Sequence, residues 1–470
     1  MPEEISQPAA PTSWMALLQD GRAKYTALLN IGVLLHAINM LVVSTVMPWI
    51  VDDIGGLPFY AWPSMLYMVG TITGAACGEP AMAALQQRSA YIFAALVFGI
   101  GAAITALAPN MTVLIAGQMV QGFGGGLLTA LSMAIVRFVF SEALRVRILS
   151  VISTTWSVAA LLGPAVGGIF VHLDWWRGAF WFSLFAVILF VVAAWRAIPG
   201  DGGEKNAPHW PLLRLLLLAA AVLCIGFAGQ IENTFTASIV MAASIALTWM
   251  TFRVDSRVPN RLFPSGAMSA FSPVGAAYLA MFLLSASHGV ALLYIPLALQ
   301  VLYGASEIWV AVFFSVFSLG WTLGALIVAG WDGRRSHHAM FWGMVLVALC
   351  AAALAHGVGA TSIWYVLFLI TLFAIGIGLA KVQMIAWSMA QALPGEESVT
   401  ASSLQSCRSL GIAFGFGAAG LVANLAGVGA GATKEVVREA MTWIYLLDIL
   451  PPALAALFVV RMLTLASARK

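Results

Sequence analysis

The sequence predicts an all-α membrane protein with fourteen spans and both termini in the cytoplasm. Three observations predict it: the composition, the number of long apolar segments, and a one-sided distribution of Lys and Arg. Of 470 residues, 61% are hydrophobic and only 9% are charged, whereas soluble domains average about 25% charged residues. A soluble fold could not bury that much apolar surface, so a lipid bilayer, the inner membrane, is the expected surrounding.

Long apolar segments supply the expected spans, since a membrane-crossing helix needs about 20 mainly apolar residues. They are 26–50, 59–84, 89–108, 111–137, 147–172, 177–198, 211–230, 236–255, 271–303, 307–331, 338–356, 361–391, 399–425 and 440–463. The pair within 211–255 is the least regular, because its turn is short and its first member begins with Arg214. Counts of twelve and fourteen both stay open.

The basic residues predict the orientation, because cytoplasmic loops are rich in Lys and Arg. With the N-terminus inside, 17 of the 22 Lys and Arg residues fall on the cytoplasmic side. Only Arg177, Lys434 and Arg438 fall outside, and Lys381 and Arg408 lie within spans. This bias requires an even number of crossings.

The expected organisation is two six-helix halves with an inserted helix pair between them. Gly70-xxx-Gly74 and Gly320-xxx-Gly324 each precede a predicted cytoplasmic loop, which hints at the internal repeat common in transporters. The predicted segments are a cytoplasmic tail (1–25), a first half (26–198), a linker (199–210), the inserted pair (211–257), a second half (271–463) and a second cytoplasmic tail (464–470).

A proline among glycines interrupts the fifth apolar segment, in the stretch LLGPAVGGIF at 161–170. Pro164 removes a backbone donor. Gly163 and Gly167 lie four residues apart on one helix face, with Gly168 beside them, so a neighbouring helix can approach closely. The pattern fits either a tight structural crossing or a crossing that also rocks.

Five stretches along the chain have distinctive sequences: MVQGFGGG (119–126), GPAVGG (163–168), DWWRGAFWFSL (174–184), YIPLALQVLYGAS (294–306) and SLQSCRSLGIAFG (403–415). Together, and in this order, they resemble the major facilitator superfamily, and above all its fourteen-span drug:proton antiporter branch. GPAVGG resembles the fifth-helix motif of that superfamily, and MVQGFGGG resembles its fourth-helix motif. The resemblance implies a major-facilitator-type bundle in which the fifth helix is a packed hinge against a helix of the other half. It also implies gating roles for Asp332, Arg334, Arg335 and Arg408.

The sequence departs from this branch at residues associated with proton coupling. Asn39 stands where the branch usually has an aspartate, and Gln118 stands where it usually has an arginine. The loop after the second span, GEPAMAALQQRS, has lost most of its charges. Asparagine keeps hydrogen bonds but cannot titrate, so proton coupling stays open.

Polar and aromatic residues within spans are the candidate substrate path, because buried ionisable groups in membranes are expensive. The candidates are His36, Asn39, Gln118, Gln121, Trp156, His288, Gln300, Trp321, Lys381 and Gln383. Each has a structural alternative: the histidines could bond carbonyls, the tryptophans could simply pack, and Lys381 and Arg408 could reach the membrane surface. Asp448 could pair with one of these cations or meet the headgroups. Such a lining suits an aromatic, polar, weakly charged solute.

Other functions lack their motifs. There is no GxxxxGK[ST] loop, so ATP is not the driver. Four scattered cysteines give no metal-ligand spacing, no basic, aromatic-interleaved stretch suggests nucleic acid, and no cofactor or enzymatic residue set is expected. The sequence favours a secondary transporter of a small aromatic or amphipathic solute, with export slightly ahead. Uptake of an aromatic nutrient such as a riboflavin-like vitamin is the alternative, and a transport-inactive receptor or scaffold is the third.

Overall fold

The computed structural model is all-helical over the residues it describes, which are 14–467 without 141, 201–210, 229–230, 232, 259–260, 268, 329–330, 332, 360, 394–395 and 429–431. The α-helices are α1 (Arg22–Ile54), α2 (Trp62–Ala76), α3 (Gly78–Leu85), α4 (Gln87–Ala106), α5 (Met111–Val139), α6 (Glu142–His172), α7 (Arg177–Ala197), α8 (Leu212–Ala228), α9 (Thr234–Asp255), α10 (Pro273–Tyr303), α11 (Glu307–Ile327), α12 (Gly333–Gly357), α13 (Ile363–Ala390), α14 (Glu397–Leu425), α15 (Lys434–Leu447) and α16 (Leu450–Ser467). Two short 3-10 helices, η1 (Trp14–Leu17) and η2 (Leu57–Phe59), precede α1 and α2.

Twelve candidate spans in the described part of the chain are long and apolar enough to cross a membrane, with α15 and α16 counted as one. Two predicted spans are shorter helices. The segment 211–230 forms α8, which has 17 residues, and the segment 59–84 is divided into α2 and α3. The count of fourteen crossings and the orientation remain predictions.

Prolines explain the two interruptions. A proline clashes with the carbonyl four residues earlier and cannot donate to it. Pro80 lies four residues after Ala76, where α2 ends, and Pro451 lies four residues after Leu447, where α15 ends. Pro164 has a milder effect, since α6 continues through it as one helix. The span predicted over 147–172 is therefore one continuous helix with Pro164 inside it.

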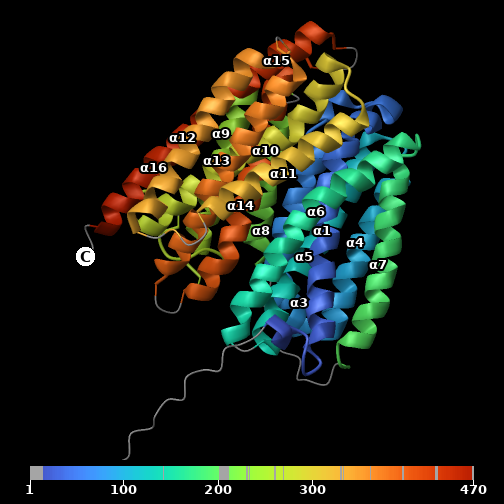
Figure 1. Cartoon of the computed structure of the whole chain (residues 1–470), viewed down its shortest axis with the longest axis vertical. Helices are drawn as coiled ribbons and strands as arrows, with labels where there is room; N and C mark the ends of the chain where they lie inside the picture. Colours follow the sequence, from blue (N-terminus) through green and yellow to red (C-terminus); the bar gives the residue numbers. More distant parts are fainter. Residues whose placement is uncertain are drawn as a thin grey trace, which may run out of the picture.

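Two groups of helices repeat the same pairing (Figure 1). In the first group α1 packs on α6, α2 on α5, and α4 on both α5 and α7. In the second group α10 packs on α14, α11 on α13, and α12 on both α13 and α16. The groups meet where α2 lies on α14 and where α6 lies on α11.

The paired glycines hold corresponding places in the two groups. A Cβ on Gly70 of α2 would lie 2.2 Å from the Met119 carbonyl oxygen of α5, and one on Gly320 of α11 would lie 2.8 Å from the Thr371 carbonyl oxygen of α13. Helices approach this closely only where glycine has no side chain. The two Gly-xxx-Gly pairs therefore make the same kind of contact in each group.

Helix α8 lies against the junction of the groups. Phe227 of α8 contacts Trp62 of α2, with ring centres 4.9 Å apart, and a Cβ on Gly417 of α14 would lie 2.7 Å from Ile225. Helix α9 packs on α8, where the Ser244 hydroxyl donates to the Ala221 carbonyl. The predicted inserted pair thus covers the α2–α14 junction.

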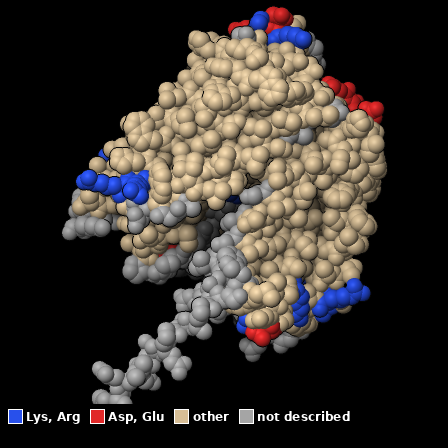
Figure 2. Space-filling view, in the orientation of Figure 1, with Lys and Arg blue, Asp and Glu red and all other residues tan. Residues whose placement is uncertain are grey.

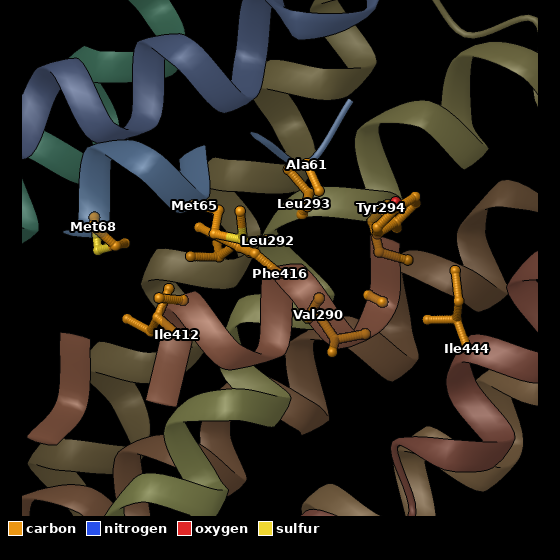
Figure 3. Close-up of a cluster of buried hydrophobic side chains, with 14 of the residues drawn as sticks. Ala61, Met65, Met68, Val290, Leu292, Leu293, Tyr294, Ile412, Phe416 and Ile444 are labelled. Carbon is orange, nitrogen blue, oxygen red and sulfur yellow. The ribbon is translucent and has the colours of Figure 1, made fainter. Parts of the chain in front are cut away.

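The groups are joined at one end of the bundle, which we call the closed end. Gln300 Nε2 donates to Asp52 at 3.3 Å, Asn424 Nδ2 donates to the Pro58 carbonyl at 3.0 Å, and the rings of Tyr60 and Tyr294 lie 5.7 Å apart. Apolar side chains of both groups fill the space beneath these contacts. Figure 3 shows part of this cluster, with Ala61, Met65, Met68, Leu293, Tyr294 and Phe416.

The surface away from the closed end is hollowed between the groups (Figure 2). The hydrogen bonds of Gln300 with Asp52 and of Asn424 with Pro58 join the two groups at the closed end. A bundle closed at one end and hollowed at the other has the shape expected of one state of an alternating-access protein.

Candidate functional site

A histidine from α1 stacks on a tyrosine from α2 in the first group. The His36 and Tyr67 rings are 5.5 Å apart with an interplanar angle of 15°, and the Tyr67 hydroxyl lies 2.8 Å from His36 Nδ1. Trp156 of α6 meets the His36 ring edge-on at 5.9 Å. Gly125 of α5 leaves room for the imidazole, since a Cβ there would lie 2.4 Å from Nδ1. We call His36, Tyr67 and Trp156 the first aromatic cluster.

The second group contains a matching arrangement. His288 of α10 stacks on Phe317 of α11 at 5.4 Å and 18°, and Trp321 meets it edge-on at 5.5 Å and 78°. His288 is buried, and its Nδ1 has no hydrogen-bond partner among the described residues. We call His288, Phe317 and Trp321 the second aromatic cluster.

In each cluster the histidine and the ring stacked on it occupy corresponding positions in the repeat, whereas Trp156 lies on α6 and Trp321 lies on α11, which are not counterparts. Tyr67 stands three residues before Gly70, and Phe317 stands three residues before Gly320. Each of these rings stacks on a histidine from the first helix of its group. Tyr67 and Phe317 therefore lie about one helical turn from the close glycine contacts of α2 and α11.

Two cationic side chains stand against the tryptophans. Lys381 of α13 is buried, and its Nζ lies 4.4 Å from the centre of the Trp321 ring. Arg408 of α14 places its guanidinium carbon 5.0 Å from the centre of the Trp156 ring, across the junction of the groups. Lys381 and Arg408 thus lie over the tryptophans of the two clusters, and we take the two clusters and the two cations together as the candidate site.

A chain of amides lies beside the first cluster. Gln121 Nε2 donates to Asn39 Oδ1 at 2.9 Å, and Gln118 Nε2 donates to Gln121 Oε1 and to the Thr105 hydroxyl, each at 3.1 Å. All four side chains are fully buried. Asn39 Nδ2 and Gln118 Oε1 lack partners among the described residues. The chain links α1, α4 and α5, and it occupies the two positions where charged residues were expected from the resemblance.

The other two glutamines do not join the central residues. Gln300 lies at the closed end, bonded to Asp52. Gln383 of α13 accepts from the Ser336 hydroxyl at 2.8 Å and donates to the Val328 carbonyl at 2.6 Å, so it fastens the ends of α11 and α12. Both therefore lie apart from the aromatic clusters, and their place on a substrate path stays a prediction.

The glycines of α6 face their own group. A Cβ on Gly163 would lie 2.7 Å from Leu41 Cβ, and one on Gly167 would lie 3.1 Å from Thr45 Cβ, both in α1. Pro164 is buried beside Gly163, whereas Gly168 has open space around it. The expected contact with a helix of the other half is therefore wrong at these glycines, although another part of α6 packs on α11.

The remaining predicted charged residues lie apart from the site. Arg334 and Arg335 are exposed at the start of α12, and Asp332 lies outside the described residues. Asp448, at the interruption between α15 and α16, accepts from the Ser287 hydroxyl at 2.9 Å. Within the described part of the chain, none of the ion pairs involves this buried carboxylate.

Sequence reasoning missed Tyr67, Phe317 and Thr105. A signal existed for the first two, because each stands three residues before a Gly-xxx-Gly pair. Within the described part of the chain, no three His, Cys, Asp or Glu side chains come close enough together to hold a metal ion.

Comparison with known proteins agrees with this architecture. The family model of the Major Facilitator Superfamily matches residues 29–416. A probable multidrug-efflux transporter of Mycobacterium tuberculosis is 30% identical over 427 residues, which is 87% of this chain and 90% of the relative. Multidrug resistance protein 3 of Bacillus subtilis is 22% identical over 402 residues, 82% of this chain and 77% of the relative.

Among solved structures, a bacterial homologue of the human lysosomal transporter Spinster, in an inward-facing and unoccupied conformation, superposes with a TM-score of 0.67. It is 14% identical, and the match covers 95% of this chain and 98% of that one. At this identity the likeness concerns the fold. The family match over most of the length, together with the 30% identical relative, shows that the chain belongs to the Major Facilitator Superfamily and is a membrane transporter, not an enzyme.

Proposed function

We propose that this chain is a secondary transporter that exports small aromatic organic molecules across the inner membrane by alternating access. The solute binds between the first and second aromatic clusters, and the halves 26–198 and 271–463 rock around it. The inserted pair 211–257 stays on the α2–α14 junction.

The observation that carries this proposal is the pair of matching aromatic clusters, one in each group of helices. Transporter sites lie near the bilayer midplane between the repeats. Rings from both groups supply flat apolar walls, and stacking adds about 0.5–1.5 kcal/mol beyond the burial of apolar area. Arg408 reaches from the second group to Trp156 of the first at 5.0 Å, so a bound solute touches both moving parts.

Export is the favoured direction because the relatives in Mycobacterium tuberculosis and Bacillus subtilis carry names of multidrug efflux or resistance. Uptake of an aromatic nutrient is the second candidate. The observation in its favour is the neutral Asn39–Gln121–Gln118 chain, which offers no titratable group for proton-driven expulsion.

Transport into proteoliposomes tests the proposal. The purified chain is reconstituted and given a panel of flat heterocycles that includes riboflavin and dye-like drugs, with and without an imposed proton gradient. Wild type should move at least one of them faster than protein-free vesicles and faster than the double variant Trp156→Ala/Trp321→Ala. Vesicles oriented by protease protection then distinguish export from uptake. Folded protein that neither binds nor moves any of these compounds would favour the receptor or scaffold alternative.

A further inference from the structure

The two cations of the site have no anionic partner in the described part of the chain. Lys381 is 3% exposed, and its Nζ has no hydrogen-bond acceptor there. Arg408 Nε is equally without an acceptor. Lys381 lies over the face of Trp321 at 4.4 Å, and Arg408 lies over the face of Trp156 at 5.0 Å.

Other carboxylates of the chain bond or pair away from the two cations. Asp52 and Asp53 bond Gln300 and Arg177 at the closed end. Asp255 pairs with Arg214, and Glu396 pairs with Arg261, both in the connections around α9 and α14. Asp448 accepts a hydrogen bond from Ser287, which precedes His288 in the sequence.

This imbalance has an energetic consequence. Arginine stays protonated at any physiological pH, and an unpaired buried charge costs several kcal/mol. A desolvated cation–π contact returns about 2 kcal/mol, which is less than the cost. When both are protonated, Lys381 and Arg408 repel each other, which adds to this cost. A bound anion would offset part of this cost, above all at Lys381, which is the more deeply buried of the two cations.

We infer that the site selects aromatic solutes that carry a negative charge, such as aryl carboxylates or aryl sulfonates. The rings of such a molecule lie between Trp156 and Trp321, and its anionic group takes the free donors of Arg408 and Lys381. Arginine offers a planar fork that matches a carboxylate, and lysine offers three rotatable donors. This inference rests on the proposed function, and it replaces the weakly charged solute expected from the sequence with an anion.

Binding of three compounds that share one ring system isolates the charge. The full-length protein in detergent is titrated calorimetrically with 2-naphthoate, 2-naphthamide and 2-naphthyltrimethylammonium, which are anionic, neutral and cationic. We expect 2-naphthoate to bind at least tenfold more tightly than the amide, a difference of 1.4 kcal/mol. The ammonium compound should bind more weakly than the amide.

Two single variants identify the residues responsible. Lys381→Gln and Arg408→Gln should each weaken 2-naphthoate binding about tenfold and change amide binding less than twofold. Lys434→Gln removes an exposed lysine at the start of α15 and should change neither. A melting temperature within a few degrees of wild type confirms that each variant is folded. Lys381→Arg keeps the positive charge, so it tests whether charge alone is enough for the preference for 2-naphthoate over the amide.

The outcomes separate this inference from the proposed function. If amide and naphthoate bind equally, and Trp156→Ala weakens both, the aromatic site stands and the anion preference is wrong. Tighter binding of the ammonium compound would also overturn it. If none of the three binds, while a panel compound is transported and depends on Trp156, the anionic ligand class is again wrong. If nothing binds and nothing is transported, the aromatic site itself fails.

Discussion

Arg408 of α14 lies with its guanidinium carbon 5.0 Å from the centre of the Trp156 ring of α6, so the contact joins the two groups of helices. Arginine and tryptophan form the strongest of the common cation–π pairs. Behind Trp156 stands His36, and behind His36 stands Tyr67. A solute that stacks on Trp156 therefore meets a surface fixed by three helices of one group and one charge from the other.

Removing this ring should weaken the binding of an aromatic solute. We expect Trp156→Ala to raise the Kd at least tenfold, which corresponds to 1.4 kcal/mol, because both stacking and buried area are lost. Trp156→Phe should restore most of the affinity. The measurement is equilibrium binding in detergent with a compound that wild type transports. Trp342→Ala, at a residue 59% exposed on α12, is the control and should bind like wild type. An unchanged Kd in Trp156→Ala would mean that this ring only packs.

The helices could be predicted well because lipid leaves the backbone little choice. Each of the twelve candidate spans falls on a predicted apolar run, and the interruptions at Cys77 and Asp448 follow from Pro80 and Pro451. The sequence also singled out His36, Trp156, His288 and Trp321. The structure places Trp156 against His36 and Trp321 against His288.

Contacts between helices were less predictable. Gln118, Gln121, Gln300 and Gln383 are the same residue type in similar apolar runs, yet two lie in a buried chain, one at the closed end and one at a loop. Their roles depend on helix tilt and on the neighbouring carbonyls, which no single helix encodes. The helix that packs against Gly163 was predicted wrongly for the same reason. A glycine indicates that another helix packs closely against it, but it does not identify that helix.

The bond between Asn39 and Gln121 should stabilise the first group. Asn39→Ala leaves the Gln121 amide without its acceptor in a fully buried place, and such a loss costs about 1–3 kcal/mol. Because Gln121→Leu removes the orphaned donor, the double variant should be more stable than the sum of the two single effects predicts. The measurement is the free energy of unfolding in detergent for all four proteins. Gln300→Ala breaks an exposed bond and should cost clearly less. Strict additivity of the two single variants would show that the pair is not coupled.

A larger side chain at Gly163 should separate α6 from α1. Leucine there would drive its Cβ to 2.7 Å from Leu41 Cβ and 3.2 Å from the Ile38 carbonyl oxygen, and overpacking costs about 1–3 kcal/mol. We expect transport to fall at least tenfold while the protein still inserts. Gly168→Leu places the same side chain where no atom lies within 4 Å, so it should transport normally. Normal transport by Gly163→Leu would remove the hinge hypothesis for this crossing.

Alternating access requires the closed end to open, and a disulfide can test this. A Cβ on Gly420 of α14 would lie 3.1 Å from Ala61 Cβ at the start of α2. Disulfides have Cβ separations of about 3.5–4.5 Å, so Ala61→Cys and Gly420→Cys should form a bond after a small adjustment. The two residues belong to opposite sides of the junction, and the bond would hold the closed end shut.

Oxidation of the double cysteine variant should stop transport, and reduction should restore it. A protease site inserted into the predicted linker 199–210 shows the cross-link directly, because the two fragments stay together on a non-reducing gel. The single variants carry the same native cysteines at 77, 224, 350 and 407, which are free thiols, so they control for other disulfides and should keep their rate under oxidant. Binding of the solute to the oxidised protein should persist, since the hollow opposite the closed end stays open to it. If the fully cross-linked protein transports at the uncrosslinked rate, the contacts of Ala61, Asp52 and Pro58 with the second group are not a gate, and the solute passes by a route that leaves the closed end intact.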